Sequence, residues 1–216
     1  MSVVESIPVR EDPTPSSSSA VVRFAGDSGD GMQLTGDPRR LENEPGMPGV
    51  VHVMDPEPYD YSFGASEEEV TRNHLIYLEE VLRYEGTDKI AALLIETVTG
   101  TNGVLAPPAG WLKGVRELTE RHGILLVCDE VMCGFGRTGK MFAFEHGGIV
   151  PDMVTMAKGL TSSYVPLGAV GLRQPIADHF RENVFWGGLT YNSHALACAT
   201  AMAVLDVIAE EDLVGN

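Results

Sequence analysis

The sequence predicts an α/β protein with a mostly parallel sheet flanked by helices. Three short apolar runs have the length and composition of strands buried on both faces: Ile90–Ile95, Ile124–Cys128 and Met153–Met156. A helical segment separates the first two runs, so they form a βαβ unit with a right-handed crossover. The 24 Gly and 13 Pro among 216 residues indicate many turns and argue against a helical bundle.

The helices carry recognisable start and stop signals. Ser66 and Glu69 form a capping box at the start of a helix that we expect to end near Gly86. Pro107-Pro108 opens a second helix, and Gly123 stops it. The remaining elements are expected to be short helices around Phe142–His146 and Pro175–Arg181, a strand at Gly168–Leu172 and a long helix from about Asn192 to Glu210.

The first third of the chain departs from this pattern. We expect residues 1–19, which are rich in Pro and Ser, to form a disordered leader. Residues 20–36 predict a strand and a glycine turn, and residues 37–65 an irregular segment with one strand candidate, Val50–Val53. Residues 66–216 form the α/β unit proper.

Charge and cysteine content exclude several classes of protein. The formal net charge of −16 argues against nucleic acid and anionic membrane surfaces as partners. The cysteines, Cys128, Cys133 and Cys198, are odd in number and lack metal or disulfide spacing, so we expect reduced thiols and no metal site. The sequence has no signal pattern and no apolar stretch of about 18 residues, which predicts a cytoplasmic protein.

Two charged residues lie at the ends of buried strand runs. Asp129 follows Ile124–Cys128, and Lys158 comes shortly after Met153–Met156. The carboxyl ends of parallel strands face the crevice in which open α/β sheets bind ligands. Pyridoxal phosphate requires such a pair, because a lysine forms a Schiff base with its aldehyde and an acid keeps its ring nitrogen protonated. The alternatives are a strand-end cap for Asp129 and a surface lysine for Lys158.

Four separated blocks carry a wider pattern: Ile95–Gly103, Asp129–Gly139, Met156–Gly168 and Gly188–His194. In this order they resemble the class III pyridoxal-phosphate-dependent aminotransferases of fold type I. The resemblance runs from about residue 36 to the end and is nearest to the subgroup with ω-amino donors, such as taurine–pyruvate aminotransferase. It implies that residues 66–216 are a partial cofactor-binding large domain, truncated at both ends.

The resemblance also implies roles for individual residues. Lys158 would carry pyridoxal 5'-phosphate as a Schiff base and then move a proton between the substrate carbon and the cofactor. Asp129 would pair with the pyridine nitrogen. Val131 would lie flat on one face of the ring, although ordinary core packing fits it equally. Thr190 would reach the cofactor phosphate of the partner subunit, which requires a homodimer.

Two further positions bear on the substrate. Glu96 follows the preceding strand and would open onto the same crevice near the substrate; the alternative is a solvated loop carboxylate. Met132 stands where many class III members carry a glutamine near the cofactor's phenolic oxygen, which is consistent with the ω-amino subgroup. Gly134–Gly139 lacks the strand–G-x-G-x-x-G–helix order of a dinucleotide site, which argues against such a site. The resemblance implies that this segment is a structural turn near the active site, in which Arg137 makes ion pairs.

By this resemblance, the chain is a transaminase that moves an amino group from an ω-amino donor, taurine-like or β-alanine-like, to pyruvate or another 2-oxo acid. Its partners would be these small molecules and a second copy of itself. The alternative is a non-catalytic, truncated or hybrid chain. The glycine- and serine-bearing phosphate cradle, the aromatic residue that stacks on the ring and the C-terminal small domain have no counterpart in the sequence.

A second resemblance concerns the start of the chain. Val21–Gly36 is similar to the amino-terminal strand and glycine turn of 2-oxoacid:ferredoxin oxidoreductase subunits. It implies a hybrid chain joined near Thr35–Arg40; the alternative is a glycine-rich loop that is similar by chance. Three cysteines without cluster spacing argue against an oxidoreductase.

Overall fold

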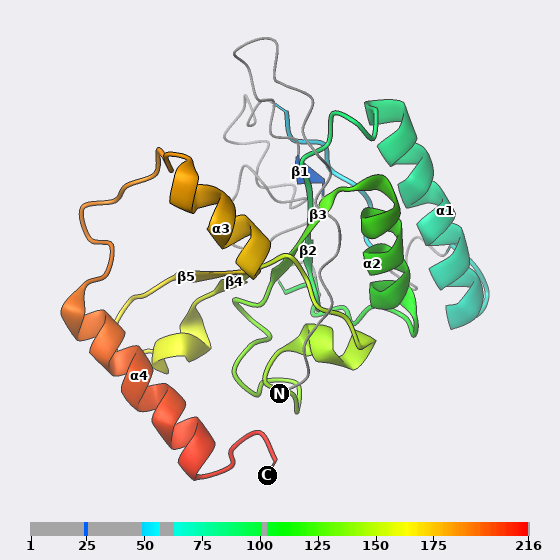
Figure 1. Ribbon diagram of the computed structural model, residues 1–216. Helices are drawn as coiled ribbons and strands as arrows, with labels where there is room; N and C mark the ends of the chain where they lie inside the picture. The colour runs from blue at the N-terminus through cyan, green and yellow to red at the C-terminus, as the bar shows by residue number, and fades with distance from the viewer. Residues whose placement is uncertain (1–23, 26–48, 57–62, 101–102, 216) are drawn as a thin grey trace, which may run out of the picture.

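A five-stranded sheet organises the described part of the chain, which comprises residues 24–25, 49–56, 63–100 and 103–215 of the computed structural model (Figure 1). Its strands follow one another in the order of the sequence: β1 (Phe24–Ala25), β2 (Ala92–Glu96), β3 (Leu125–Asp129), β4 (Met153–Met156) and β5 (Ala169–Leu172). The first four strands are parallel, and β5 runs antiparallel to β4. The predicted mostly parallel α/β architecture is confirmed.

The two long helices before β3 begin and end where local signals place them. In α1 (Glu67–Glu85), Ser66 Oγ accepts a hydrogen bond from Glu69 N at 3.3 Å, which confirms the predicted cap. The Glu69 carboxylate accepts in return from Ala65 N at 2.8 Å. The helix α2 (Trp111–His122) begins after Gly110, later than Pro107-Pro108 suggested, and ends at Gly123. Gly123 adopts φ 66°, a left-handed conformation that glycine tolerates without strain.

The main hydrophobic core lies between the sheet and the helices α1 and α2, which lie side by side at the right of Figure 1. Side chains alternate along each strand, so Leu93 and Ile95 face this core while Ala92 and Leu94 face the opposite side. Because both faces are covered by side chains, β2 is buried as its apolar run predicted. Gly114 allows the helices to approach closely, since a Cβ atom there would collide with the Leu75 side chain.

The second half of the chain adds shorter elements beside β4 and β5. These are the 3-10 helices η2 (Ala143–Gly147) and η3 (Lys158–Thr161) and the α-helices α3 (Gln174–Glu182) and α4 (Ala195–Glu210). The predicted start of α4 at about Asn192 was three residues early. Helix α4, red at the lower left of Figure 1, packs against η3. This contact connects the end of the described chain to the segment that carries Lys158.

A buried ion network fixes the sheet to α2. Arg116 Nη1 lies 2.7 Å from Asp152 Oδ2, and Arg173 Nη1 lies 3.3 Å from Asp152 Oδ1. Asp152 Oδ2 also accepts a hydrogen bond from Leu126 N at 2.8 Å. Because the three partners come from α2, β3 and the end of β5, one carboxylate holds the register of these elements. The sequence analysis did not identify this network.

Several expectations about the first third concern residues outside the described part. They are the disordered leader, the glycine turn, most of the irregular segment and the junction near residues 35–40. Within residues 49–56, the strand candidate Val50–Val53 is wrong, because only Val51 makes an isolated bridge. None of the helices in the described ranges is long and apolar enough to cross a membrane.

Candidate functional site

A row of polar side chains crosses the carboxyl ends of three neighbouring strands. Glu96 on β2 is the register partner of Asp129 on β3, and Asp129 is the register partner of Thr155 on β4. Register partners in a sheet point to the same face, and that face lies opposite α1 and α2 because Asp129 alternates with the core residue Cys128. We call Glu96, Asp129 and Thr155 the polar row. Two residues earlier on each strand, and on the same face, lies an apolar row of register partners: Leu94, Val127 and Met153.

Asp129 is held in a fixed orientation. The residue is only 7% exposed, and its Oδ1 accepts a hydrogen bond from Val131 N at 2.8 Å. This bond forms within the turn that follows β3, so the backbone itself orients the acid. Val131 is half-buried in the same turn. A carboxylate that is oriented and shielded from water is suited to bind a cationic N–H group.

Glu96 is tied to the turn that follows its own strand. Its Oε2 accepts a hydrogen bond from Gly100 N at 2.5 Å. Met132 covers this turn, since a Cβ atom on Gly100 would come within 2.9 Å of the Met132 sulfur. Glu96 is therefore a half-buried, backbone-bonded group rather than a solvated loop carboxylate.

Lys158 lies two residues beyond the end of β4, at the start of η3, and is exposed. Its φ of 40° is in the left-handed region, which costs a residue with a side chain on the order of 1–3 kcal/mol. The neighbouring backbone is anchored: a Cβ atom on Gly159 would lie 3.1 Å from the Phe135 side chain, and Leu160 is buried. An open depression of about 660 Å³ is lined by Lys158 and by residues of the segment up to Gly168. The unusual backbone at Lys158 is thus supported by packing next to an accessible hollow.

Glu130 is a second buried carboxylate, which the sequence analysis did not single out. It is fully buried and faces the side opposite to Asp129. Its Oε1 accepts from Thr97 Oγ1 and from Phe144 N, both at 2.9 Å, and its Oε2 accepts from Ala143 N at 3.0 Å. Burial raises the pKa of Glu130, while the hydrogen bonds that its carboxylate accepts act to lower this pKa. The only sequence signal was its position directly after Asp129 at the end of a strand.

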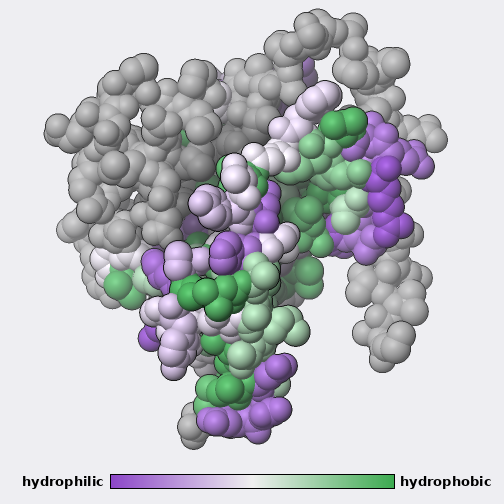
Figure 2. All heavy atoms as spheres, turned by 90° about the vertical axis from the view of Figure 1, so that its left-hand side faces the viewer, coloured by the Kyte–Doolittle hydropathy of each residue, from purple (hydrophilic) through white to green (hydrophobic). Residues whose placement is uncertain are grey.

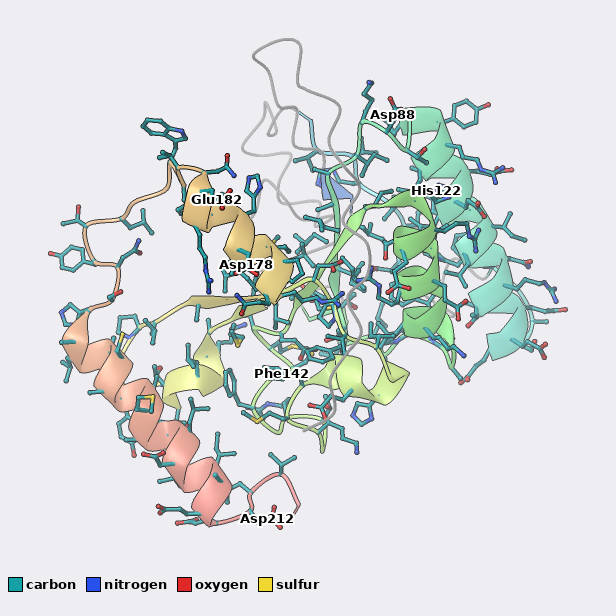
Figure 3. The ribbon with its side chains drawn as sticks, viewed as in Figure 1. Asp88, His122, Phe142, Asp178, Glu182 and Asp212 are labelled. Carbon is teal, nitrogen blue, oxygen red and sulfur yellow. The ribbon has the colours of Figure 1, made fainter. Side chains whose placement is uncertain are left out.

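Glu130 and three aromatic rings connect the end of β3 to the segment that carries Lys158. Phe142, labelled in Figure 3, directly precedes η2 and is stacked on Phe144 with ring centroids 5.4 Å apart. Its ring also meets that of Phe135 edge-on at 5.6 Å. Since Phe135 packs on Gly159, the chain of contacts runs from Glu130 through the aromatic rings to the residue after Lys158.

Two other predicted residues lie apart from the polar row. Thr190 is exposed on a turn before α4, in the orange segment at the far left of Figure 1. Arg137 is exposed and pairs with no acidic side chain among the described residues. The structure therefore brings Glu96 and Asp129 together, with Lys158 just beyond the neighbouring strand, and leaves Thr190 at the surface.

Two of the thiols and one histidine of the described ranges lie in the core. Cys128 and Cys133 are buried, and burial raises the pKa of both thiols. His74 Nδ1 accepts from Trp111 Nε1 at 2.9 Å, and its Nε2 lies 2.7 Å from Met54 O, which makes it a satisfied neutral core residue. Among the residues that the structure describes, no group of three His, Cys, Asp or Glu side chains is placed to hold a metal ion.

Residues 18–216 match the protein family described as Aminotransferase class-III. The match takes in nearly the whole chain, including the blocks that contain Asp129 and Lys158. The chain belongs to the class III aminotransferases. These enzymes depend on pyridoxal phosphate.

Individual class III relatives support this assignment. An uncharacterised aminotransferase of Sinorhizobium fredii is 39% identical over 178 residues, covering 79% of this chain and 38% of the relative. An (S)-enantioselective omega-transaminase of Thermomicrobium roseum superposes with a TM-score of 0.85 at 38% identity, over 91% of this chain and 45% of its own. A taurine:2-oxoglutarate aminotransferase of Bifidobacterium kashiwanohense was solved with pyridoxal phosphate and glutamate. It superposes with a TM-score of 0.84 at 44% identity, over 90% of this chain and 46% of its own.

The comparisons also bear on the extent of the chain. It spans under half of the length of these class III relatives. The family match begins at residue 18 and so includes residues 21–36. It gives no support to a separate, oxidoreductase origin for that segment.

Proposed function

We propose that this sheet edge binds pyridoxal 5'-phosphate and that the chain acts as a transaminase. The amino donor would be an ω-amino compound, taurine-like or β-alanine-like, and the acceptor pyruvate or another 2-oxo acid. The observation that carries the proposal is the placement of Asp129 in the polar row, with Lys158 two residues past the end of the adjoining strand β4.

Asp129 fits the role of the partner of the ring nitrogen. The backbone N–H of Val131 fixes one carboxylate oxygen, and burial keeps water from competing for the rest of the group. A charge-assisted hydrogen bond from a protonated pyridine nitrogen is strong in such surroundings. Val131, in the same turn, would provide the apolar contact to one face of the ring.

Lys158 fits the role of the covalent anchor and proton carrier. Pyridoxal phosphate, when bound, supplies an aldehyde for attachment and a ring that accepts electrons. Lys158 Nζ would attach to the aldehyde, and after its release by the substrate amine it would move a proton at the substrate carbon. The left-handed backbone at Lys158 sets the direction from which its side chain reaches the hollow.

The substrate class is supported by the family and by one pair of side chains. Glu96 and Met132 lie together at the turn after β2, so the acid and an apolar group adjoin Asp129. A solved relative is named a taurine:2-oxoglutarate aminotransferase, which supports a donor whose amino group is not on the carbon that bears its acid group. We assign the ω-amino donor class on these grounds.

A second chain would complete the binding site of the cofactor phosphate. Thr190 lies in an exposed turn shortly before α4, where hydroxyl and backbone donors are available to an anion. Helix α4 is apolar on most sides yet buries only Ala197 and Ala201, and Figure 2 shows green apolar surface along it. A homodimer that covers this surface would place Thr190 at the neighbouring site.

A second candidate is a chain that binds the cofactor without turning over. It is favoured by one observation, that Thr190, the residue expected at the cofactor phosphate, is exposed on a turn before α4. Affinity for pyridoxal phosphate without amino transfer would distinguish this candidate from the first.

The test begins with the purified chain and pyridoxal 5'-phosphate. We expect a visible absorption band, and after borohydride reduction a cofactor label on Lys158 that peptide mass spectrometry can locate. Lys158→Ala should abolish both signals, whereas Lys140→Ala, which removes another exposed lysine, should leave them unchanged. A label on any residue other than Lys158 would refute the proposal.

Turnover is measured separately with taurine or β-alanine as donor and pyruvate as acceptor. Formation of alanine supports the transaminase. A labelled but inactive chain supports the second candidate.

A further inference from the structure

Thr155 carries a buried hydroxyl group without a hydrogen-bond partner among the described residues. Such groups are rare in folded proteins, because burying a hydroxyl without a partner costs free energy. The backbone of Thr155, in contrast, is fully engaged: its carbonyl accepts from Glu130 N at 2.9 Å, and the residue pairs with Val170 on β5. The unsatisfied group is therefore held in place rather than mobile.

The position of this hydroxyl points to Asp129. Thr155 and Asp129 are register partners on adjacent parallel strands and share one face of the sheet. Strands lie about 4.8 Å apart, so a side chain of one partner can reach the carboxylate of the other. A carboxylate offers about four acceptor sites, so Asp129 can accept from Thr155 in addition to Val131 N.

We propose that Thr155 is a positioning residue for Asp129 in the loaded protein. When the ring nitrogen of pyridoxal phosphate occupies this face, the Thr155 hydroxyl donates to the Asp129 carboxylate. Asp129 would then be braced from the turn after β3 by Val131 N and from β4 by Thr155. This inference rests on the proposed cofactor binding.

The decisive variant is Thr155→Val, which keeps the shape of the side chain and removes the hydroxyl. Without cofactor it should be more stable than the wild type, with Tm raised by about 3 °C, because the unsatisfied group is gone. With pyridoxal 5'-phosphate it should bind about tenfold more weakly, because a bond to a charged acceptor is lost. Thr155→Ser keeps the hydroxyl and should bind nearly as the wild type does.

Thr119→Val is the matched control. Thr119 is also buried, but its hydroxyl donates to Arg116 O at 3.0 Å on the other side of the sheet. The control should lower Tm and leave the dissociation constant of pyridoxal 5'-phosphate unchanged. If the Thr155 hydroxyl had only a structural role, Thr155→Val would likewise lower Tm and leave the dissociation constant of pyridoxal 5'-phosphate unchanged.

The outcomes separate this inference from the proposed function. If the wild type shows the cofactor band and Thr155→Val binds equally well, only the inference is overturned. It is overturned in the same way if Thr155→Val is less stable than the wild type without cofactor. If the wild type shows no band, cofactor binding and the role of Thr155 fall together. Greater stability with weaker binding supports the inference.

Discussion

Glu96 and Asp129 are direct register partners on β2 and β3, so two carboxylates stand side by side on one face of the sheet. Each is oriented by a backbone N–H of the turn that follows its own strand, Gly100 N for Glu96 and Val131 N for Asp129. Local turns therefore contribute to the orientation of both carboxylates. Groups that are fixed in this way need little rearrangement when a ligand binds.

Replacing Asp129 tests the charge rather than the shape of the site. Asn at this position can still accept from Val131 N, so we expect the fold to remain and the affinity for pyridoxal 5'-phosphate to fall by at least about tenfold. Spectroscopic titration measures the affinity, and thermal unfolding checks the fold. Asp178→Asn is the control, because Asp178 is a surface acid on α3 that pairs with Arg181 at 3.2 Å. Equal affinities for the two variants would contradict the role of Asp129.

The buried Glu130 should make stability depend on pH. Burial raises its pKa, whereas in the unfolded chain a glutamate titrates near its ordinary value of about 4.3. Above that pH the folded protein holds a proton that the unfolded chain has released, so this group's contribution to the free energy of unfolding falls as the pH rises. Glu130→Gln lacks the titration. We expect denaturant unfolding from pH 4 upward to show the wild type losing stability relative to this variant.

The opposite trend would have a clear meaning. If the wild type gained stability over Glu130→Gln as the pH rose, the hydrogen bonds from Thr97, Ala143 and Phe144 would outweigh the burial of the charge. Glu145→Gln, at an exposed carboxylate in the same loop, serves as the control for effects of net charge.

The ion network at Asp152 should be costly to break from one side. Asp152→Ala removes the buried carboxylate that pairs with Arg116 at 2.7 Å and leaves this guanidinium only the more exposed Glu120, at 2.9 Å. It also removes the acceptor of Leu126 N. We expect a loss of about 3–5 kcal/mol in the free energy of unfolding. Chemical denaturation measures this loss. Asp178→Ala is the control, because it breaks the exposed ion pair of Asp178 with Arg181, and we expect it to lower the free energy of unfolding by at most about 1 kcal/mol. A similar small loss for both variants would show that the network contributes little.

The sequence predicted elements better than it predicted contacts between them. The strands β2, β3 and β4 were visible because a strand covered on both faces is a continuous apolar run. Asp129 was visible because it closes such a run. Glu130 follows one residue later and reads as part of the same turn. Its burial depends on a loop folding back over it, which no local pattern encodes.

The same limit applies to Thr155 and Asp152. Within its own strand, Thr155 is an ordinary β-branched residue of a run. Only the register of β4 against β3 places Thr155 on the same face of the sheet, next to Asp129. Asp152 has partners 36 and 21 residues away in the sequence, Arg116 and Arg173, so its network exists only in the folded chain.

The apolar surface of α4 predicts self-association. Leu196, Met202 and Val207 are 61%, 60% and 45% exposed, respectively, on a helix that is apolar on most sides. Exposed apolar patches of this kind mark surfaces that other chains cover. Met202→Glu should therefore shift the chain from dimer to monomer in sedimentation velocity. Val150→Glu introduces the same charge at another exposed apolar residue, 63% exposed and outside α3 and α4, and should leave the dimer intact. Because Thr190 would act across this interface, the monomeric variant should also bind pyridoxal 5'-phosphate more weakly, and unchanged affinity would exclude Thr190 of a second chain from the site.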